Sequence, residues 1–172
     1  MKTRKLGKSG LEVAPLCLGC NVFGWTVDEP AAFRLLDSMV ASGLNFLDTA
    51  DVYSRWAQGN SGGESETIIG KWLKRSGARD NVIIATKVGM EMEAGKKGLS
   101  KSYILQAAED SLRRLQTDYI DLLLMHCVVS AKWPEELRKQ MDLLTKLKTQ
   151  GKVRALGVSA DTAYDAGLID WL

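Results

Sequence analysis

Polar side chains stand just after successive apolar segments of this 172-residue chain, at the points where strands would end. They are Asp48, with Tyr53 five residues later, Lys87, Ser159 and His126, the single histidine. If the apolar segments are parallel strands, their carboxyl ends converge at one face, and these side chains converge with them. Taken singly, each has an ordinary explanation, such as a turn cap, a solvated amine, a structural imidazole or a packed loop ring. Their shared position favours a common site.

The residue types suit proton transfer to a carbonyl oxygen. A tyrosine hydroxyl has an unperturbed pKa of about 10, too high for easy proton donation near neutral pH. A nearby lysine cation lowers that pKa, and a carboxylate keeps the lysine charged and in place. A histidine can orient the carbonyl oxygen or share in the proton relay. The set predicts carbonyl reduction, in which hydride adds to carbon and tyrosine protonates oxygen. One histidine with scattered carboxylates lacks metal-ligand spacing, so no metal site is expected.

The segments that must position these side chains alternate between strand and helix patterns. Residues 3–6 and 11–14 flank a glycine-containing turn and predict a hairpin. Strands are expected at 16–19, 44–47, 82–85, 119–125 and 153–158, and helices at 28–43, 64–77, 100–115, 133–151 and from about 161. This rhythm predicts right-handed parallel βαβ units. A doubly wound sheet and a (β/α)8 barrel both fit, but no GxGxxG follows the first strand to favour the former.

Composition narrows the class of protein. The chain is 45% hydrophobic, which is enough for a core, and its net charge of +2 comes without a basic stripe, so no nucleic-acid partner is expected. No segment approaches the roughly 20 apolar residues of a membrane span, and Glu12 and Pro15 interrupt the only stretch that could form a signal peptide. We therefore expect a cytoplasmic protein with no membrane partner.

Cys17 and Cys20 have CxxC spacing, which is also found at redox sites. A redox pair of this kind opens a helix, whereas these two residues belong to an apolar strand, on which positions three apart face opposite sides. We expect reduced, buried strand thiols.

The motifs around the polar residues resemble the aldo-keto reductase family, especially its bacterial members and the potassium-channel β-subunit branch. They are Asp48-Thr49-Ala50-x-x-Tyr53, Gly63-Glu64-Ser65-Glu66 leading to Gly70, Ala85-Thr86-Lys87, Leu122-Leu123-Leu124-Met125-His126 and Gly151-Lys152-Val153-Arg154-x-x-Gly157-Val158-Ser159. The resemblance implies a (β/α)8 TIM-type barrel and NADPH-dependent reduction of aldehydes or ketones. It also implies that Tyr53 is the general acid, Lys87 lowers its pKa, Asp48 holds Lys87, and His126 orients the carbonyl.

The resemblance assigns a second set of residues to the cofactor. Ser159 and Ala160 would lie at the nicotinamide carboxamide, although Ala160 stands where the family usually has Asn. The remaining positions, near the nicotinamide ribose, are Gly19, Cys20, Asn21, Val22 and Asp48. Cys127 to Ser130 replace a loop that often contains Pro and Asp, which implies an unusual substrate pocket.

The number of strands sets an expectation for architecture. Five βα units and an N-terminal hairpin are found where a complete barrel has eight strands, so residues 1–172 are expected to form a single, incomplete barrel domain. An open sheet edge invites pairing, and we expect a homo-oligomer, such as a dimer, that covers it. The predicted function is NADPH-dependent carbonyl reduction. The alternative is a truncated, non-catalytic or regulatory relative that self-associates through that edge.

Overall fold

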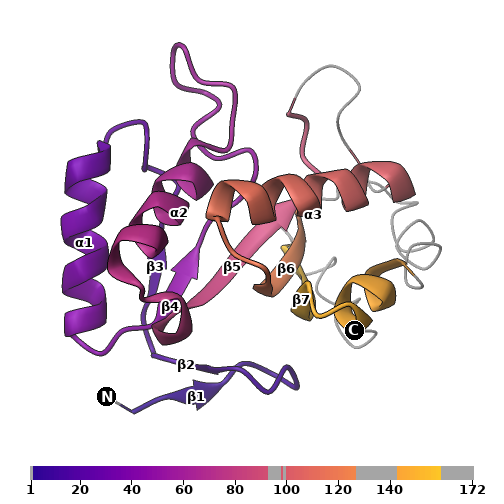
Figure 1. Cartoon of the computed structure of the whole chain (residues 1–172), viewed down its shortest axis with the longest axis horizontal. Helices are drawn as coiled ribbons and strands as arrows, with labels where there is room; N and C mark the ends of the chain where they lie inside the picture. Colours follow the sequence, from indigo (N-terminus) through magenta and orange to yellow (C-terminus); the bar gives the residue numbers. More distant parts are fainter. Residues whose placement is uncertain (1, 93–97, 99, 127–142, 160–172) are drawn as a thin grey trace.

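Five parallel strands form the central sheet. The computed structural model describes residues 2–92, 98, 100–126 and 143–159 (Figure 1). The strands are β3 (Cys17–Gly19), β4 (Phe46–Asp48), β5 (Ile83–Val88), β6 (Ile120–His126) and β7 (Val153–Ser159). Each strand pairs with the next one along the chain, in the order β3-β4-β5-β6-β7. A doubly wound sheet reverses its strand order, whereas this order runs in one direction, as in a barrel. The sheet therefore confirms five strands of a TIM-type α/β barrel.

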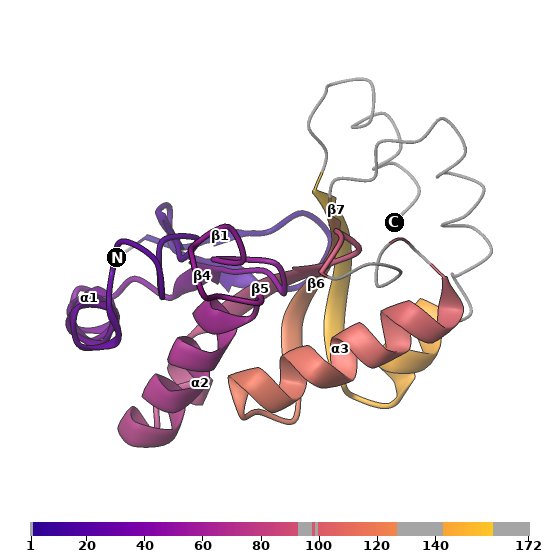
Figure 2. The same cartoon turned by 90° about the horizontal axis from the view of Figure 1, so that it is seen from above.

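Helices cover the outer face of the sheet (Figure 2). They are α1 (Glu29–Ala41), α2 (Glu64–Ser76), α3 (Lys101–Leu115) and the helical residues 143–149. Asp28 caps the start of α1, because its Oδ1 accepts a hydrogen bond from the Ala31 N–H at 2.9 Å. Gly77 ends α2 in the left-handed region, with φ of 66°. The beginning of the helix predicted at 133–151, and the helix predicted from 161, lie outside the described residues.

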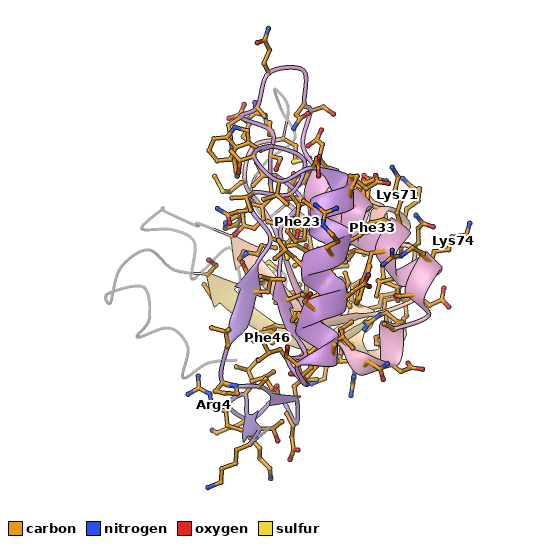
Figure 3. The ribbon with its side chains drawn as sticks, turned by 90° about the vertical axis from the view of Figure 1, so that its left-hand side faces the viewer. Arg4, Phe23, Phe33, Phe46, Lys71 and Lys74 are labelled. Atoms are coloured by element: carbon orange, nitrogen blue, oxygen red, sulfur yellow. The ribbon has the colours of Figure 1, made fainter. Side chains whose placement is uncertain are left out.

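The main core lies between the sheet and the helices. Fully buried side chains of both layers meet there, among them Leu36, Ile69, Trp72, Ile84 and Leu123. Burying a side chain of this size stabilises the fold by about 1.5–3 kcal/mol. Figure 3 shows the opposite, outer side of α2, where Lys71 and Lys74 point away from the sheet. The strands and helices are therefore held together by their apolar faces, as the sequence pattern predicted.

A smaller apolar cluster lies on the inner face of the sheet. It contains Leu11, Ala85, Leu122 and Ala155, with Leu6, Phe46, Ile83 and Leu124 packed against them. Leu6 and Leu11 come from the hairpin of β1 (Arg4–Lys5) and β2 (Glu12–Val13), which lies beneath the amino ends of the strands (Figure 1). Asn45 fastens this hairpin, because its side chain accepts from the Ala14 N–H and donates to the Glu12 carbonyl. The hairpin thus covers the end of the sheet opposite the polar residues.

The strand β3 lies at an edge of the sheet, and this corrects one prediction about the cysteines. Cys20 is buried as expected, but Cys17 is exposed. Cys17 pairs with Phe46 and therefore lies on the open inner face of the sheet, and an edge strand has a neighbour on one side only. Both thiols are free.

The helices among the described residues are all too short or too polar to span a membrane.

Candidate active site

Strand register brings four of the polar residues to one face. Asp48 pairs with Ala85 on β5, Lys87 pairs with Leu124 on β6, and His126 pairs with Ser159 on β7. Residues paired in a parallel ladder share a face, and every second residue along a strand returns to that face. Asp48, Lys87, His126 and Ser159 therefore all lie on the inner face, at the carboxyl ends of their strands.

Lys87 is the centre of this group. Its side chain is only 6% exposed, and its Nζ lies 2.7 Å from Asp48 Oδ1. The same nitrogen donates hydrogen bonds to Asp48 Oδ2 at 2.8 Å, to the Thr49 carbonyl at 2.9 Å and to the Tyr53 hydroxyl at 2.7 Å. A buried ammonium needs this many partners, since desolvation of a charge is compensated only by good pairing and hydrogen bonding.

Tyr53 reaches the site from the segment after β4. Its hydroxyl accepts the Lys87 hydrogen bond and donates to Asp48 Oδ2 at 3.2 Å. The next residue, Ser54, has φ of 72°, a conformation that costs about 1–3 kcal/mol for a residue other than glycine. The Ser54 Oγ donates to the Phe23 carbonyl at 2.6 Å, and Asn60 Nδ2 donates to the Gly24 and Ser54 carbonyls. These bonds fasten the Tyr53 segment to the loop after β3.

His126 completes the group from the end of β6. It is 7% exposed, and its ring centroid lies 6.0 Å from that of Tyr53 with the planes at 77°. The structure thus brings together all four predicted catalytic residues, Asp48, Tyr53, Lys87 and His126. The four side chains are close together in the structure, whereas the catalytic role of each one stays a prediction.

The cysteines differ in how close they come to this site. Although Cys17 is exposed on the edge strand, partial desolvation and the Asp48 carboxylate raise its pKa to about 11, against the Lys87 cation. Burial raises the pKa of Cys20 further. Both thiols therefore stay protonated near neutral pH, and neither is a nucleophile there.

The predicted cofactor residues fall into two groups. Gly19 is open on its side-chain face, where an added Cβ would meet only Asn21 Oδ1 at 3.7 Å, and Asn21 is itself exposed. Ser159 lies beside His126. Cys20 differs, because its N–H donates to the Asp48 carbonyl and its own carbonyl accepts from Ser65 Oγ. Both polar groups of the Cys20 backbone therefore have hydrogen-bond partners within the fold. Val22 is half-buried, and Ala160 lies outside the described residues.

Two tryptophans near Tyr53 did not figure in the sequence prediction. The Trp56 ring lies 6.0 Å from the Tyr53 ring, and Trp25 lies 5.9 Å from Trp56 in an edge-to-face contact. Both are about half exposed. Their clustering beside Tyr53 depends on the fold of two separate loops, so the sequence offered no clear signal for it.

A buried ion pair supports the end of β5 from outside. Glu66 is fully buried, and it accepts hydrogen bonds from Thr86 Oγ1 at 2.5 Å and from Arg114 Nε at 2.6 Å. Thr86 precedes Lys87, so this pair fixes the backbone from which the Lys87 side chain extends. In the described portion of the chain, no group of three or more His, Cys, Asp or Glu residues could hold a metal ion.

Comparison with known proteins agrees with the fold. The family model described as "Aldo/keto reductase family" matches residues 15–172. Protein tas of Escherichia coli (strain K12) is 35% identical over 184 aligned residues, which cover 95% of this chain and 53% of that protein. The uncharacterized oxidoreductase YqkF of Bacillus subtilis (strain 168) is also 35% identical, over 93% of this chain and 49% of its own length. The chain spans about half the length of these two relatives.

A solved structure shows the same relationship in three dimensions. The holo form of aldo-keto reductase AKR11C1 from Bacillus halodurans superposes with a TM-score of 0.80 at 40% identity, over 97% of this chain and 53% of that one. This chain belongs to the aldo-keto reductase family, and its relatives in that family are oxidoreductases.

Proposed function

We propose that this chain carries the proton-transfer site of an NADPH-dependent reductase of aldehydes and ketones. The observation that supports the proposal most directly is the 2.7 Å contact between Lys87 Nζ and the Tyr53 hydroxyl. In this role Tyr53 protonates the carbonyl oxygen. The Lys87 cation stabilises the phenolate that is left behind, since an opposite charge nearby favours the ionised form.

Asp48 and His126 have supporting roles in the same proposal. Asp48 holds Lys87 through both carboxylate oxygens and accepts a hydrogen bond from Tyr53, so it orients the two groups together. His126 lies against the Tyr53 ring, where its imidazole can orient the carbonyl oxygen before the proton moves. The carbonyl would stand on the open inner side of the sheet, against these two rings.

The nicotinamide end of a cofactor fits the same rim. Gly19 leaves space for a ring to approach, and Asn21 and Ser159 offer polar groups at the edge strands of the sheet. The Cys20 N–H and carbonyl already have partners within the fold, and the cofactor contact expected of this residue stays a prediction. When bound, the cofactor supplies the hydride that adds to the carbonyl carbon.

The proposal is tested by mixing the purified chain with NADPH and benzaldehyde and following the loss of NADPH absorbance. Tyr53→Phe should lower kcat by about 10²–10⁴-fold, the usual contribution of a positioned general acid. Activity that is unchanged in Tyr53→Phe would overturn the assignment of the acid. NADH in place of NADPH, at equal concentration, tests the choice of cofactor.

An alternative function rests on the inner face of the sheet. Phe46, Ile83 and Leu124 are only partly buried there, and β3 is an exposed edge in the described structure. A non-catalytic or regulatory family member would cover these surfaces by self-association, and the same surfaces motivate a homo-oligomer in either case. A monomer that binds NADPH tightly, seen by size exclusion with light scattering and a fluorescence titration, would rule the alternative out. We further expect a cytoplasmic protein without nucleic-acid or membrane partners.

A further inference from the structure

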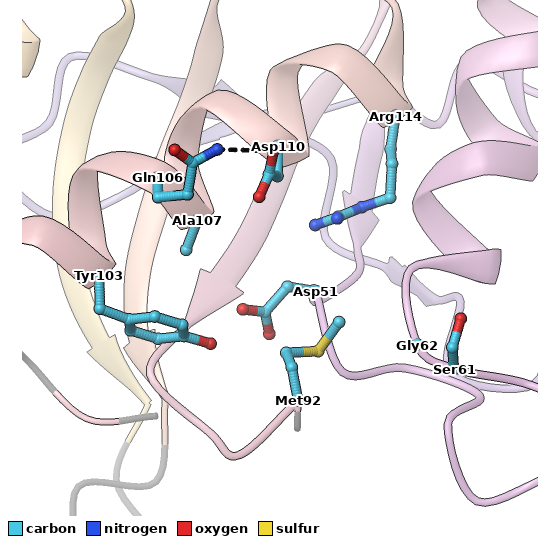
Figure 4. A pocket seen from close by; sticks show the side chains of 9 residues that line it. All are labelled: Asp51, Ser61, Gly62, Met92, Tyr103, Gln106, Ala107, Asp110 and Arg114. Atoms are coloured by element: carbon cyan, nitrogen blue, oxygen red, sulfur yellow. Dashed lines mark hydrogen bonds between the residues drawn. The ribbon is translucent and has the colours of Figure 1, made fainter. Parts of the chain in front are cut away.

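A second polar pocket lies on the outer side of the sheet, between α3 and the loops that follow β4 and β5 (Figure 4). Its volume is about 420 Å³. One face of α3 supplies Tyr103, Gln106, Asp110 and Arg114, and the loops supply Asp51 and Met92. None of the four proposed catalytic residues lines it. The pocket is therefore separate from the reductase site.

Asp51 is the unusual group in this pocket. It is 1% exposed, and among the described residues neither of its carboxylate oxygens has a hydrogen-bond partner. Its backbone is fixed, because the Asp51 N–H donates to the Lys87 carbonyl at 3.0 Å. Figure 4 shows the carboxylate directed into the space beside the Tyr103 hydroxyl and Met92. A buried polar group without a partner is rare in folded proteins, and a carboxylate in this position has unused acceptor capacity.

The neighbouring charges do not satisfy Asp51. The nearest cation that lines the pocket, Arg114, gives its Nε to Glu66 at 2.6 Å and its Nη2 to Ser111 Oγ at 3.3 Å. Asp110 adds a second carboxylate, which is bound to Arg113 and Gln106 on its own helix. The Arg114 cation is thus compensated by buried Glu66, and the pocket keeps an excess of negative charge.

The same surroundings affect protonation. Burial and the Glu66 carboxylate raise the pKa of Asp51 to about 7, opposed by the Arg114 and Lys87 cations and by the Val52 backbone. Burial and Asp51 raise the pKa of Tyr103 to about 12, so its hydroxyl stays neutral and donates to the Met90 carbonyl at 3.3 Å. Its oxygen and its ring face remain suitable for a ligand that donates hydrogen bonds or carries positive charge.

We propose that this pocket binds a small primary ammonium ion with a short apolar arm, the ammonium on Asp51 and the arm along Met92, Ala107 and the Tyr103 ring. A primary ammonium supplies three donors and the countercharge that the buried carboxylate lacks. The arm uses the apolar part of the lining. A metal ion fits less well, because the described residues offer no cluster of three ligands. This site is independent of the proposed reductase function, and its failure would leave that function untouched.

The probe is n-butylammonium chloride, titrated into the full chain by calorimetry at constant ionic strength. Two probes serve as comparisons: n-butanol has the arm without the charge, and tetramethylammonium has the charge without N–H donors. We expect n-butylammonium to bind at least about tenfold more tightly than either, since one lost ion pair or hydrogen-bond set is worth about that factor. Its affinity should rise about tenfold between about pH 6 and about pH 8, as Asp51 ionises.

Two variants and one control complete the experiment. Asp51→Asn keeps the shape and removes the charge, and Ala107→Met fills the space for the arm; each should weaken n-butylammonium binding at least about tenfold. Asp118→Asn, an exposed carboxylate outside the pocket, should leave binding unchanged. Thermal unfolding confirms that each variant folds. Equal binding of n-butanol, undiminished binding to Asp51→Asn, or no binding to the parent chain would each overturn the proposal.

Discussion

The Lys87 ammonium lies 2.7 Å from the Tyr53 hydroxyl, and the two groups share Asp48 as a common partner. Lys87 and Tyr53 come from different segments, a central strand and the loop after its neighbour. Their contact joins the sheet to that loop, so the same bonds that order the site also hold the loop on the fold. Substitutions in this group should therefore affect both kinetics and stability, and the two effects can be measured separately.

Lys87→Met should lower kcat for NADPH-dependent reduction of benzaldehyde by about 10²-fold or more. The variant keeps an unbranched side chain and removes the cation that stabilises the Tyr53 phenolate, a term that acts mainly in the transition state. KM should change much less than kcat, which steady-state kinetics will show. Lys74→Met, on the exposed side of α2, is the control and should keep the parental kcat.

Asp48→Asn should destabilise the fold by about 1–3 kcal/mol. It leaves the nearly buried Lys87 ammonium without a countercharge, and removal of one partner from such a pair exposes the cost of desolvation. Urea unfolding gives the free energy. Glu29→Gln breaks the exposed Lys71–Glu29 pair and should have a much smaller effect, because surface ion pairs contribute little. Equal losses in the two variants would contradict the central role of the Lys87 pair.

Gly70→Ala should destabilise the packing of α2 against α3 by about 1–3 kcal/mol. A Cβ at this helical position would lie 2.1 Å from the Arg114 carbonyl oxygen, a backbone atom that can move only with its helix. Thermal unfolding should show a lower Tm. Lys74→Ala, an exposed position one turn after the buried Gly70 in the same helix, is the control, and its Tm should stay near that of the parent. An unchanged Tm for Gly70→Ala would show that the two helices separate easily.

Asp51→Asn should change how stability depends on pH. The pKa of Asp51 is about 7 in the folded chain, against an ordinary value near 3.8. Between these values the folded state binds more protons than the unfolded state, so the free energy of unfolding falls as the pH rises from about 4 to about 7. The variant lacks this decline. Without added ligand it should be more stable than the parent above about pH 7, on the order of a few kcal/mol.

Urea unfolding at about pH 5 and about pH 8 checks this prediction. The difference between Asp51→Asn and the parent chain should grow with pH, whereas Asp118→Asn should parallel the parent at both values. A parent chain whose stability rises over the same interval as much as that of Asp51→Asn would contradict a raised pKa at Asp51.

Much of the fold could be predicted from the spacing of apolar residues and from the residues that begin or end helices. The helices predicted at 28–43 and 64–77 begin at a capping residue, Asp28, and end at a glycine, Gly77, and the apolar segments before Asp48 and Lys87 form central strands. These signals are local: a cap or a breaker acts on the few residues beside it, so it can be read without the rest of the molecule. The strand and helix pattern by itself could not separate a barrel from a doubly wound sheet, because both use the same local units, and the family resemblance was what favoured the barrel.

Two features were missed or mistaken because they depend on neighbours distant in the chain. Cys17 was expected to be buried, but β3 is an edge strand, and the position of a strand within a sheet is not encoded in its own residues. Nothing in the sequence around Asp51 indicated that its carboxylate is buried. Its burial results from α3, about fifty residues further along the chain. Its raised pKa results first from that burial and then from the Glu66 carboxylate, and the Arg114 cation offsets only part of this rise.

The sequence by itself determined which side chains follow the strands, and hence that Asp48, Lys87, His126 and Ser159 belong to one rim. Side chains alternate between the two faces of a strand, so the residues that share a face can be found by counting along each strand. Only the tertiary structure decided that the Tyr53 hydroxyl reaches Lys87 Nζ, because that contact depends on the fold of the loop after β4. The loop is held there by hydrogen bonds from Ser54 and Asn60 to the loop after β3, and such long-range bonds leave no pattern in the sequence.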